Sequence, residues 1–135
     1  MSTHKIDVIV EDGNEVTIVT LSGLADPAGI HALLTELDSL AQQGAALRLL
    51  LDETDLQAGL MGLSDIQDIV GDWRKASALK SRRIAVVASN PLIRGLNQMF
   101  RIFANIENKG SVSAFSNRTD ALAWLVRPLG VEPSK

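Results

Sequence analysis

Residues 46–52 read Ala-Leu-Arg-Leu-Leu-Leu-Asp, a short apolar run that ends in an acidic residue. The run is shorter than an ordinary helix, and its almost continuous apolar character is typical of a buried strand. Residues 83–88 read Arg-Ile-Ala-Val-Val-Ala and repeat the pattern. The two runs predict the central strands of a sheet that is covered by helices.

A helical pattern precedes each of these two predicted strands in the sequence. Asp26-Pro27 predicts an N-cap followed by a first helical residue, and Gly44 ends the helix. Between them the apolar residues share one helical face: Ile30, Leu33, Leu34, Leu37, Leu40 and Ala41. A second helix is predicted over residues 64–79, because Ser64 and Gln67 have the spacing of a capping box. Its apolar face comprises Ile66, Ile69, Val70 and Trp73.

Two further helices and a hairpin complete the predicted elements. Asn90-Pro91 begins a third, strongly apolar helix, and Asn117 with Asp120 begins a last one that follows a short strand at residues 111–115. At the start of the chain, residues 5–11 and 15–21 suit two strands. The turn sequence Asp12-Gly13-Asn14 between them predicts an antiparallel hairpin.

The order of these elements predicts the fold class. Strands that alternate with helices imply crossover connections and therefore parallel pairing. We expect a single-domain α/β protein with a mainly parallel five-stranded sheet, an N-terminal antiparallel hairpin and four helices. The domain is predicted to span residues 1–127, and residues 128–135, with Pro128 and Pro133, are expected to form a frayed tail.

Composition bounds the function. The chain has 135 residues, 46% hydrophobic and 21% charged, which suits one soluble globular domain. The absence of cysteine excludes disulfides, thiolate nucleophiles and Cys-bearing metal sites. Neither a signal peptide nor an apolar run long enough to span a membrane is visible, so we expect a cytoplasmic protein. The net charge of −3 argues against nucleic acid as a partner.

The charges are distributed unevenly. Residues 1–72 carry thirteen acids and two bases, whereas residues 73–106 carry seven bases and no acid. Cations near the end of the second helix favour its dipole, but this does not explain all seven. Arg94 and Arg101 are seven residues apart and flank the apolar stripe of the third helix. The basic stretch therefore suits a protein partner, a second copy of the chain or an anionic membrane surface, or serves only the helix ends.

The whole pattern resembles the SpoIIAA-like family, relatives of the STAS domains of anti-sigma-factor antagonists. The resemblance covers residues 16–125 and rests on Val16 to Gly23, the helix after Asp26, Leu49 to Asp52, Arg83 to Val87 and Ala121 to Leu125. It implies a superhelix of β-α units, akin also to the lipid-binding lobe of SEC14-type carriers. Most members of that family have no established activity, and the residues of this chain suggest no cofactor.

STAS regulators carry a phosphorylatable serine in an Asp-Ser context at the start of their second helix. That pair is missing here, since residues 52–64 read Asp-Glu-Thr-Asp-Leu-Gln-Ala-Gly-Leu-Met-Gly-Leu-Ser. Ser64 is the nearest hydroxyl. We interpret it as the first residue of the capping box and, less favourably, as a phosphoacceptor.

Few residues suggest chemistry. Asp52, Glu53 and Asp55 follow a predicted strand, where ligands of parallel sheets bind, and they suggest a cation site or an acid–base pair. No histidine is near them in the sequence, so we predict neither a catalytic site nor a metal site. His4 is placed in a mobile terminus, and His31 is placed on the surface of the first helix.

We therefore predict a non-enzymatic regulatory or protein-interaction module. The alternative is a carrier or sensor of an apolar, lipid-like ligand that binds under the third helix. Either occupant would use the flexible segment from Leu56 to Leu63 and the third helix, because both expose more apolar side chains than one sheet face needs. The predicted surface comprises Leu60, Met61, Leu63, Arg94, Leu96, Met99, Phe100, Arg101 and Phe103.

Overall fold

The computed structural model describes residues 2–45, 48–57, 62–76, 83–88 and 112–127. Its elements are, in chain order, β1 (Ser2–Glu11), β2 (Asn14–Leu24), α1 (Pro27–Gln42), β3 (Arg48–Gln57), α2 (Leu63–Lys75), β4 (Arg83–Val87), β5 (Val112–Phe115) and α4 (Arg118–Leu125). The five strands form one sheet in the order β1-β2-β3-β4-β5. β1 and β2 are antiparallel, and the remaining pairs are parallel. The predicted single-domain α/β class is confirmed.

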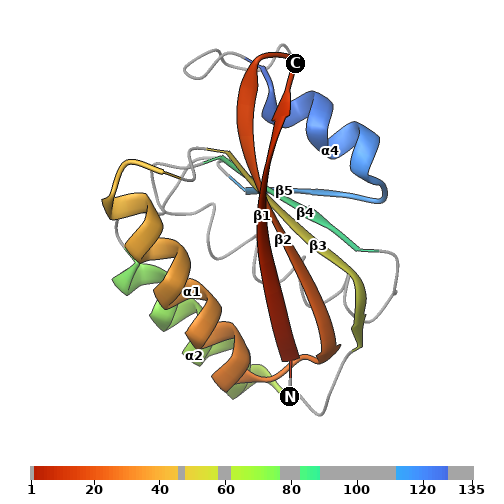
Figure 1. Ribbon diagram of the computed structural model, residues 1–135. Helices are drawn as coiled ribbons and strands as arrows, with labels where there is room; N and C mark the ends of the chain where they lie inside the picture. The colour runs from red at the N-terminus through yellow and green to blue at the C-terminus, as the bar shows by residue number, and fades with distance from the viewer. Residues whose placement is uncertain (1, 46–47, 58–61, 77–82, 89–111, 128–135) are drawn as a thin grey trace.

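The sheet lies between two helical layers. Figure 1 views it from the β1 edge, with α1 and α2 on one face and α4 on the other. The adjacent residues Leu49 and Leu50 are both fully buried, and each belongs to a different core cluster. Leu49 packs with the α1 and α2 side, and Leu50 packs with α4. The predicted double-sided burial of this strand is confirmed.

The hairpin and the first helix form as their sequences predict. Asp12 and Gly13 have φ values of 49° and 76°, and positive φ at both residues is what a two-residue type I′ hairpin requires. α1 begins at Pro27, although the side chain of Asp26 makes no capping hydrogen bond. Gly44 has a φ of 83° just beyond the helix end. That left-handed conformation is accessible to glycine at little cost, so Gly44 ends the helix as predicted.

Several boundaries differ from the predictions, those of β3 and α2 by the largest margins. β3 extends to Gln57 instead of ending at Asp52, and Leu56 is buried in the core instead of belonging to a flexible surface segment. β3 continues because β2 pairs with it as far as Leu24. α2 ends at Lys75, since Ala76 has already left the helical conformation. The predicted third helix, from Asn90 to Phe103, lies outside the described residues.

The described helices are short or amphipathic. In the ranges that the structure covers, no helix combines the length and apolar character needed to cross a membrane. Ile66, Ile69, Val70 and Trp73 of α2 are all buried, as the predicted apolar face requires. α4 buries only Ala121 and Leu125.

We expect Leu50→Ala to lower the free energy of unfolding by about 2–5 kcal/mol, because Leu50 is 0% exposed between the sheet and α4. Urea denaturation measures the change. The matched control is Leu24→Ala at a side chain that is 48% exposed, which should change stability by less than about 0.5 kcal/mol. Equal losses for the two variants would contradict the two-sided core.

Candidate functional site

Most of the surface predicted from the sequence lies outside the described residues. This holds for Leu60, Met61, Arg94, Leu96, Met99, Phe100, Arg101 and Phe103. Leu63 is the first residue of α2, and Ser64 is the second. That the segment ending at Leu63 and the predicted third helix form one surface stays a prediction.

Ser64 is not the cap of α2. Gly62 occupies the N-cap position, and its N–H donates to Oδ2 of Asp65 at 2.9 Å. The predicted capping box of Ser64 and Gln67 is therefore wrong. The helix begins earlier because a carboxylate at its third residue satisfies the amide of Gly62 and is favoured by the positive end of the helix dipole. Ser64 is exposed in the first turn.

The three acids of β3 do not form a site together. They lie within the strand rather than beyond it, and they have three different environments: Asp52 is partly buried, Glu53 is 8% exposed and Asp55 is exposed. Among the residues that the structure covers, no group of three His, Asp or Glu side chains is placed to hold a metal ion. The hypothesis of a cation site at these acids gains no support from this geometry.

Asp52 has two structural partners. Its Oδ1 accepts hydrogen bonds from the amide of Thr54 at 3.0 Å and from the Thr54 hydroxyl at 2.6 Å. Its Oδ2 lies 3.1 Å from Nη2 of Arg118, the first residue of α4. Burial raises the pKa of Asp52, but the hydrogen bonds from Thr54 and the charge of Arg118 outweigh burial and lower the pKa overall. Asp52 is therefore an ionised carboxylate that ties β3 to α4.

Both histidines connect elements. His4 lies in β1, and its Nε2 lies 3.2 Å from Oε2 of Glu36 in α1. Its predicted position in a mobile terminus is wrong, because β1 begins at Ser2 and pairs along its whole length with β2. Nδ1 of His31 lies 3.0 Å from Oδ2 of Asp72, which joins the exposed faces of α1 and α2.

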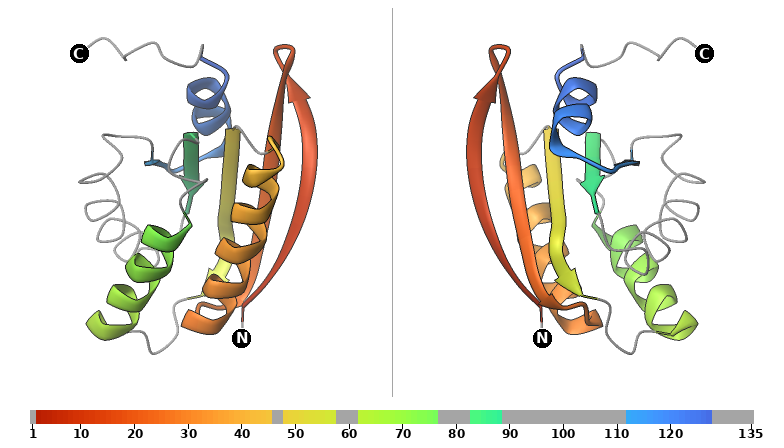
Figure 2. Two further views of the ribbon diagram at one scale, coloured as in Figure 1. Left: turned by 90° about the vertical axis from the view of Figure 1, so that its left-hand side faces the viewer. Right: turned by 90° about the vertical axis from the view of Figure 1, so that its right-hand side faces the viewer.

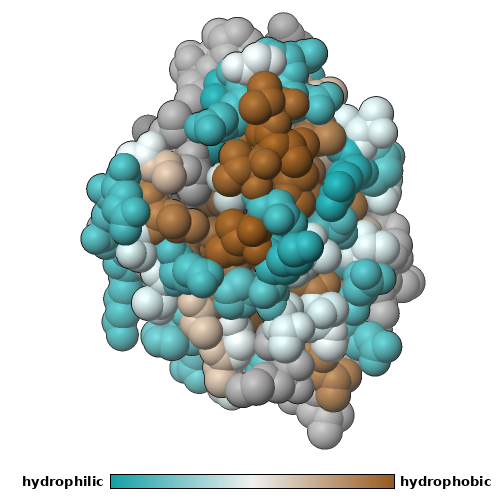
Figure 3. Space-filling view, in the orientation of Figure 1, coloured by the Kyte–Doolittle hydropathy of each residue, from teal (hydrophilic) through white to brown (hydrophobic). Residues whose placement is uncertain are grey.

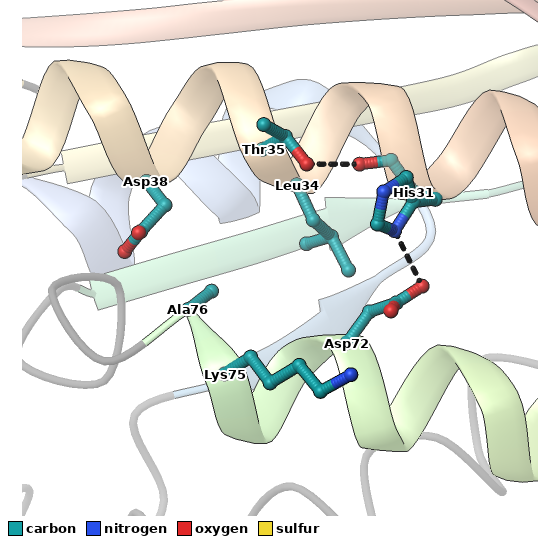
Figure 4. Close-up of a pocket in the computed structure, with 7 residues that line it drawn as sticks. All are labelled: His31, Leu34, Thr35, Asp38, Asp72, Lys75 and Ala76. Carbon is teal, nitrogen blue, oxygen red and sulfur yellow. Dashed lines mark hydrogen bonds and ion pairs between the residues drawn. The ribbon is translucent and has the colours of Figure 1, made fainter.

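The His31–Asp72 pair borders a cavity of about 120 Å³ between α1 and α2. Figure 4 shows its lining residues, with apolar Leu34 and Ala76 and a polar border of His31, Thr35, Asp38, Asp72 and Lys75. The cavity is smaller than the roughly 300–1,000 Å³ of ordinary ligand pockets. The spacing of His31, Thr35 and Asp38 places them on one helical face, a pattern that our sequence analysis missed.

Part of the basic stretch has a structural role. Arg83 donates from Nη1 to the backbone oxygens of Trp124 and Arg127, both at 3.0 Å, and its guanidinium lies 5.2 Å from the Trp124 ring centre. Arg48 donates from Nε to the Leu125 oxygen at 2.9 Å. Burial, followed by the charges of Arg48 and Arg127, lowers the pKa of Arg83. These arginines stabilise the carbonyl end of α4, where cations are favoured.

The other basic residues of residues 73–106 fall into two groups. Arg74 and Lys75 lie in the last turn of α2, as expected for cations near a helix C-terminus. Lys80, Arg82, Arg94 and Arg101 lie outside the described residues. The purpose of the full basic stretch stays a prediction.

Comparison with known proteins identifies the architecture. A family model described as SpoIIAA-like matches residues 16–126. An uncharacterised protein from Shewanella loihica with a SpoIIAA-like fold is similar over 93% of this chain and 95% of its own, at 20% identity and a TM-score of 0.61. The unphosphorylated anti-sigma factor antagonist SpoIIAA is similar over 96% of this chain and 100% of its own, at 15% identity and a TM-score of 0.58.

A third similar structure is an anti-sigma factor antagonist from Mycobacterium paratuberculosis. It has 19% identity and a TM-score of 0.52 over 91% of this chain and 94% of its own. No curated protein matches the chain. At these identities the solved structures show a common fold.

We expect Asp52→Asn to lower the free energy of unfolding by about 1 kcal/mol at neutral pH. Because the pKa of Asp52 is lowered in the fold, its stabilisation is present above the unfolded pKa of about 3.9 and is lost as the pH falls through the folded value. Denaturation at neutral pH and near pH 3 tests this, with Asp55→Asn as the exposed control on the same strand. A difference between wild type and Asp52→Asn that is equal at both pH values would contradict the assignment.

Proposed function

Because the chain belongs to the SpoIIAA-like family, we propose that it is a regulatory module that acts by binding a protein partner and not by catalysis. Two of its similar structures are anti-sigma factor antagonists, which are named for the regulatory protein that they oppose. The partner here is a protein of the same general kind, one whose activity changes when it is bound.

The engagement of Asp52 supports the absence of catalysis most directly. With Glu53 and Asp55, this residue is one of the three acids that the sequence suggests as a cation site or an acid–base pair. A general base must be free to accept a proton from a substrate, and a general acid needs a raised pKa. Asp52 instead has a lowered pKa, and both of its carboxylate oxygens have partners.

The proposed partner surface combines the segment before α2 with residues 91–104. Leu60, Met61 and Leu63 would contribute adaptable apolar contacts, and Arg94 and Arg101 would contact acidic groups of the partner. The small cavity between α1 and α2 would add a place for one partner side chain. The module would work without a phosphoserine, because the Asp-Ser pair is missing.

The alternative is a carrier of an apolar or amphiphilic ligand. It would use the same surface, with Phe100 and Phe103 against the ligand and Arg94 at its charged end. The two functions differ in what stays bound during purification, so one experiment distinguishes them.

Native mass spectrometry of the full chain, purified from its own host, tests the proposed function. We expect a stoichiometric co-purifying protein. A retained lipid mass would support the carrier and contradict the module. A phosphate mapped to Ser64 in the same spectra would contradict a module that works without phosphoserine.

We expect Phe100→Asp to abolish capture of that protein while the melting temperature stays within a few degrees of wild type. The matched control, Leu24→Asp, alters an apolar side chain that is 48% exposed in β2 and should retain capture. The contrary outcome is a large fall in the melting temperature of Phe100→Asp, because an unpaired charge buried in a core is strongly destabilising. That result would assign Phe100 to the core and remove it from the partner surface.

A further inference from the structure

The outer side of β1 is an open sheet edge. β1 is the first strand in the sheet order, and all ten of its residues pair with β2. On its other side no strand among the described residues pairs with it. A long edge strand is a template for pairing with another chain, and natural proteins normally shorten, twist or cover such edges.

The same edge carries exposed apolar side chains. Val8 and Val10 are 59% and 69% exposed, and Leu24 is the only other large apolar side chain in the described ranges that is comparably exposed. Figure 3, which looks onto the β1 edge, shows apolar side chains gathered over the upper half of the β1–β2 hairpin. Figure 2 shows that the turn of this hairpin extends beyond the start of β3.

The turn determines which backbone groups point outward. In a two-residue hairpin the residues that flank the turn, Glu11 and Asn14, form a hydrogen-bonded pair. Hydrogen-bonded and non-hydrogen-bonded pairs alternate from there. The N–H and C=O groups of Val10, Val8, Ile6 and His4 therefore point away from β2. Two of these four residues, Val8 and Val10, also carry the exposed apolar side chains.

We propose that two copies of this chain form a dimer by antiparallel pairing of β1 with β1, around a two-fold axis at Val8. The two sheets then join into one, and each outward-pointing backbone group gains a partner. Val8 lies opposite Val8 of the partner subunit, and Ile6 lies opposite Val10 of the partner subunit. Both exposed valines become part of a continuous apolar row.

Charge selects this register. Lys5, 78% exposed, lies opposite Glu11 of the partner subunit, and the symmetry forms this pair twice. An axis at Lys5 would place two lysines opposite each other, and an axis at Asp7 would place two aspartates opposite each other. An axis at Ile9 would oppose Asp7 and Glu11 of the partner subunit. These three registers are disfavoured by repulsion between like charges.

Among the axes that pair at least seven residues of β1, an axis at Ile6 is the remaining competitor. It would pair Lys5 with Asp7 of the partner subunit, but Val10 would lie opposite Ser2 of the partner subunit, and Val8 opposite His4 of the partner subunit. The exposed valines would then have polar neighbours. The axis at Val8 is favoured because it satisfies the charges and covers the apolar side chains together.

Cysteine cross-linking tests the register, since the chain contains no cysteine. We expect full-length Val8→Cys to form a disulfide-linked dimer on mild oxidation, because opposite residues lie about 5.5 Å apart between Cα atoms. Ile6→Cys is the matched control. Its two copies would be four residues out of register, about 13 Å apart, and should not cross-link. The reverse result would overturn the axis at Val8.

Sedimentation equilibrium tests the dimer itself. We expect a wild-type dimer, a monomer for Val8→Asp with an almost unchanged melting temperature, and about tenfold weaker association for Lys5→Glu. The double variant Lys5→Glu with Glu11→Lys should restore association, because it exchanges the two charges. A wild-type monomer at all concentrations, or a dimer that persists in Val8→Asp, would overturn the proposal.

Discussion

The burial of β3 and β4 on both faces is the constraint on which the rest of the structure depends. Successive strand residues point to opposite faces, so the adjacent and fully buried Leu49 and Leu50 require cover on both sides of the sheet. Each such side chain contributes roughly 1.5–3 kcal/mol by leaving water. α1 and α2 supply the cover on one face, and α4 supplies it on the other. Parallel strands with helices on both faces follow directly.

α4 depends on charged residues of β3 and β4 for its position. A helix of eight residues has little stability of its own, and this one buries only Ala121 and Leu125. Its first residue, Arg118, pairs with Asp52, and its last carbonyls accept from Arg48 and Arg83. Arg48 and Arg83 at the starts of β3 and β4 thus hold the end of the helix, and Asp52 in the middle of β3 holds its beginning. This explains why a carboxylate at the end of a buried apolar run has a structural role here.

A sheet covered on both faces leaves only its edges and the outer sides of its helices for contact with other molecules. The acidic and polar residues on α1 and α2 meet across a small cavity, where His31 pairs with Asp72. The β1 edge, by contrast, exposes valines, and no strand in the described part of the chain pairs with its outer side. Partner binding and self-association can therefore occupy separate surfaces of one small domain.

The sequence by itself determined the features that depend on neighbouring residues. The turn at Asp12-Gly13, the helix end at Gly44, the N-cap at Asn117 and the apolar faces of α1 and α2 all form as predicted. Each depends on backbone preference or helical spacing over a few residues. The order of such elements also predicted a parallel sheet with an antiparallel hairpin, and the SpoIIAA-like resemblance that it supported is confirmed.

Only the tertiary structure decided the roles of the polar residues. Asp52 looked like a ligand until Arg118, 66 positions later in the chain, was placed beside it. Gly62 and Asp65, and not Ser64, form the N-terminal cap of α2. Arg83 donates a hydrogen bond to a backbone oxygen of α4. The physical reason is range: backbone conformation depends on adjacent residues, whereas a charge is paired by whichever group the fold brings within about 4 Å.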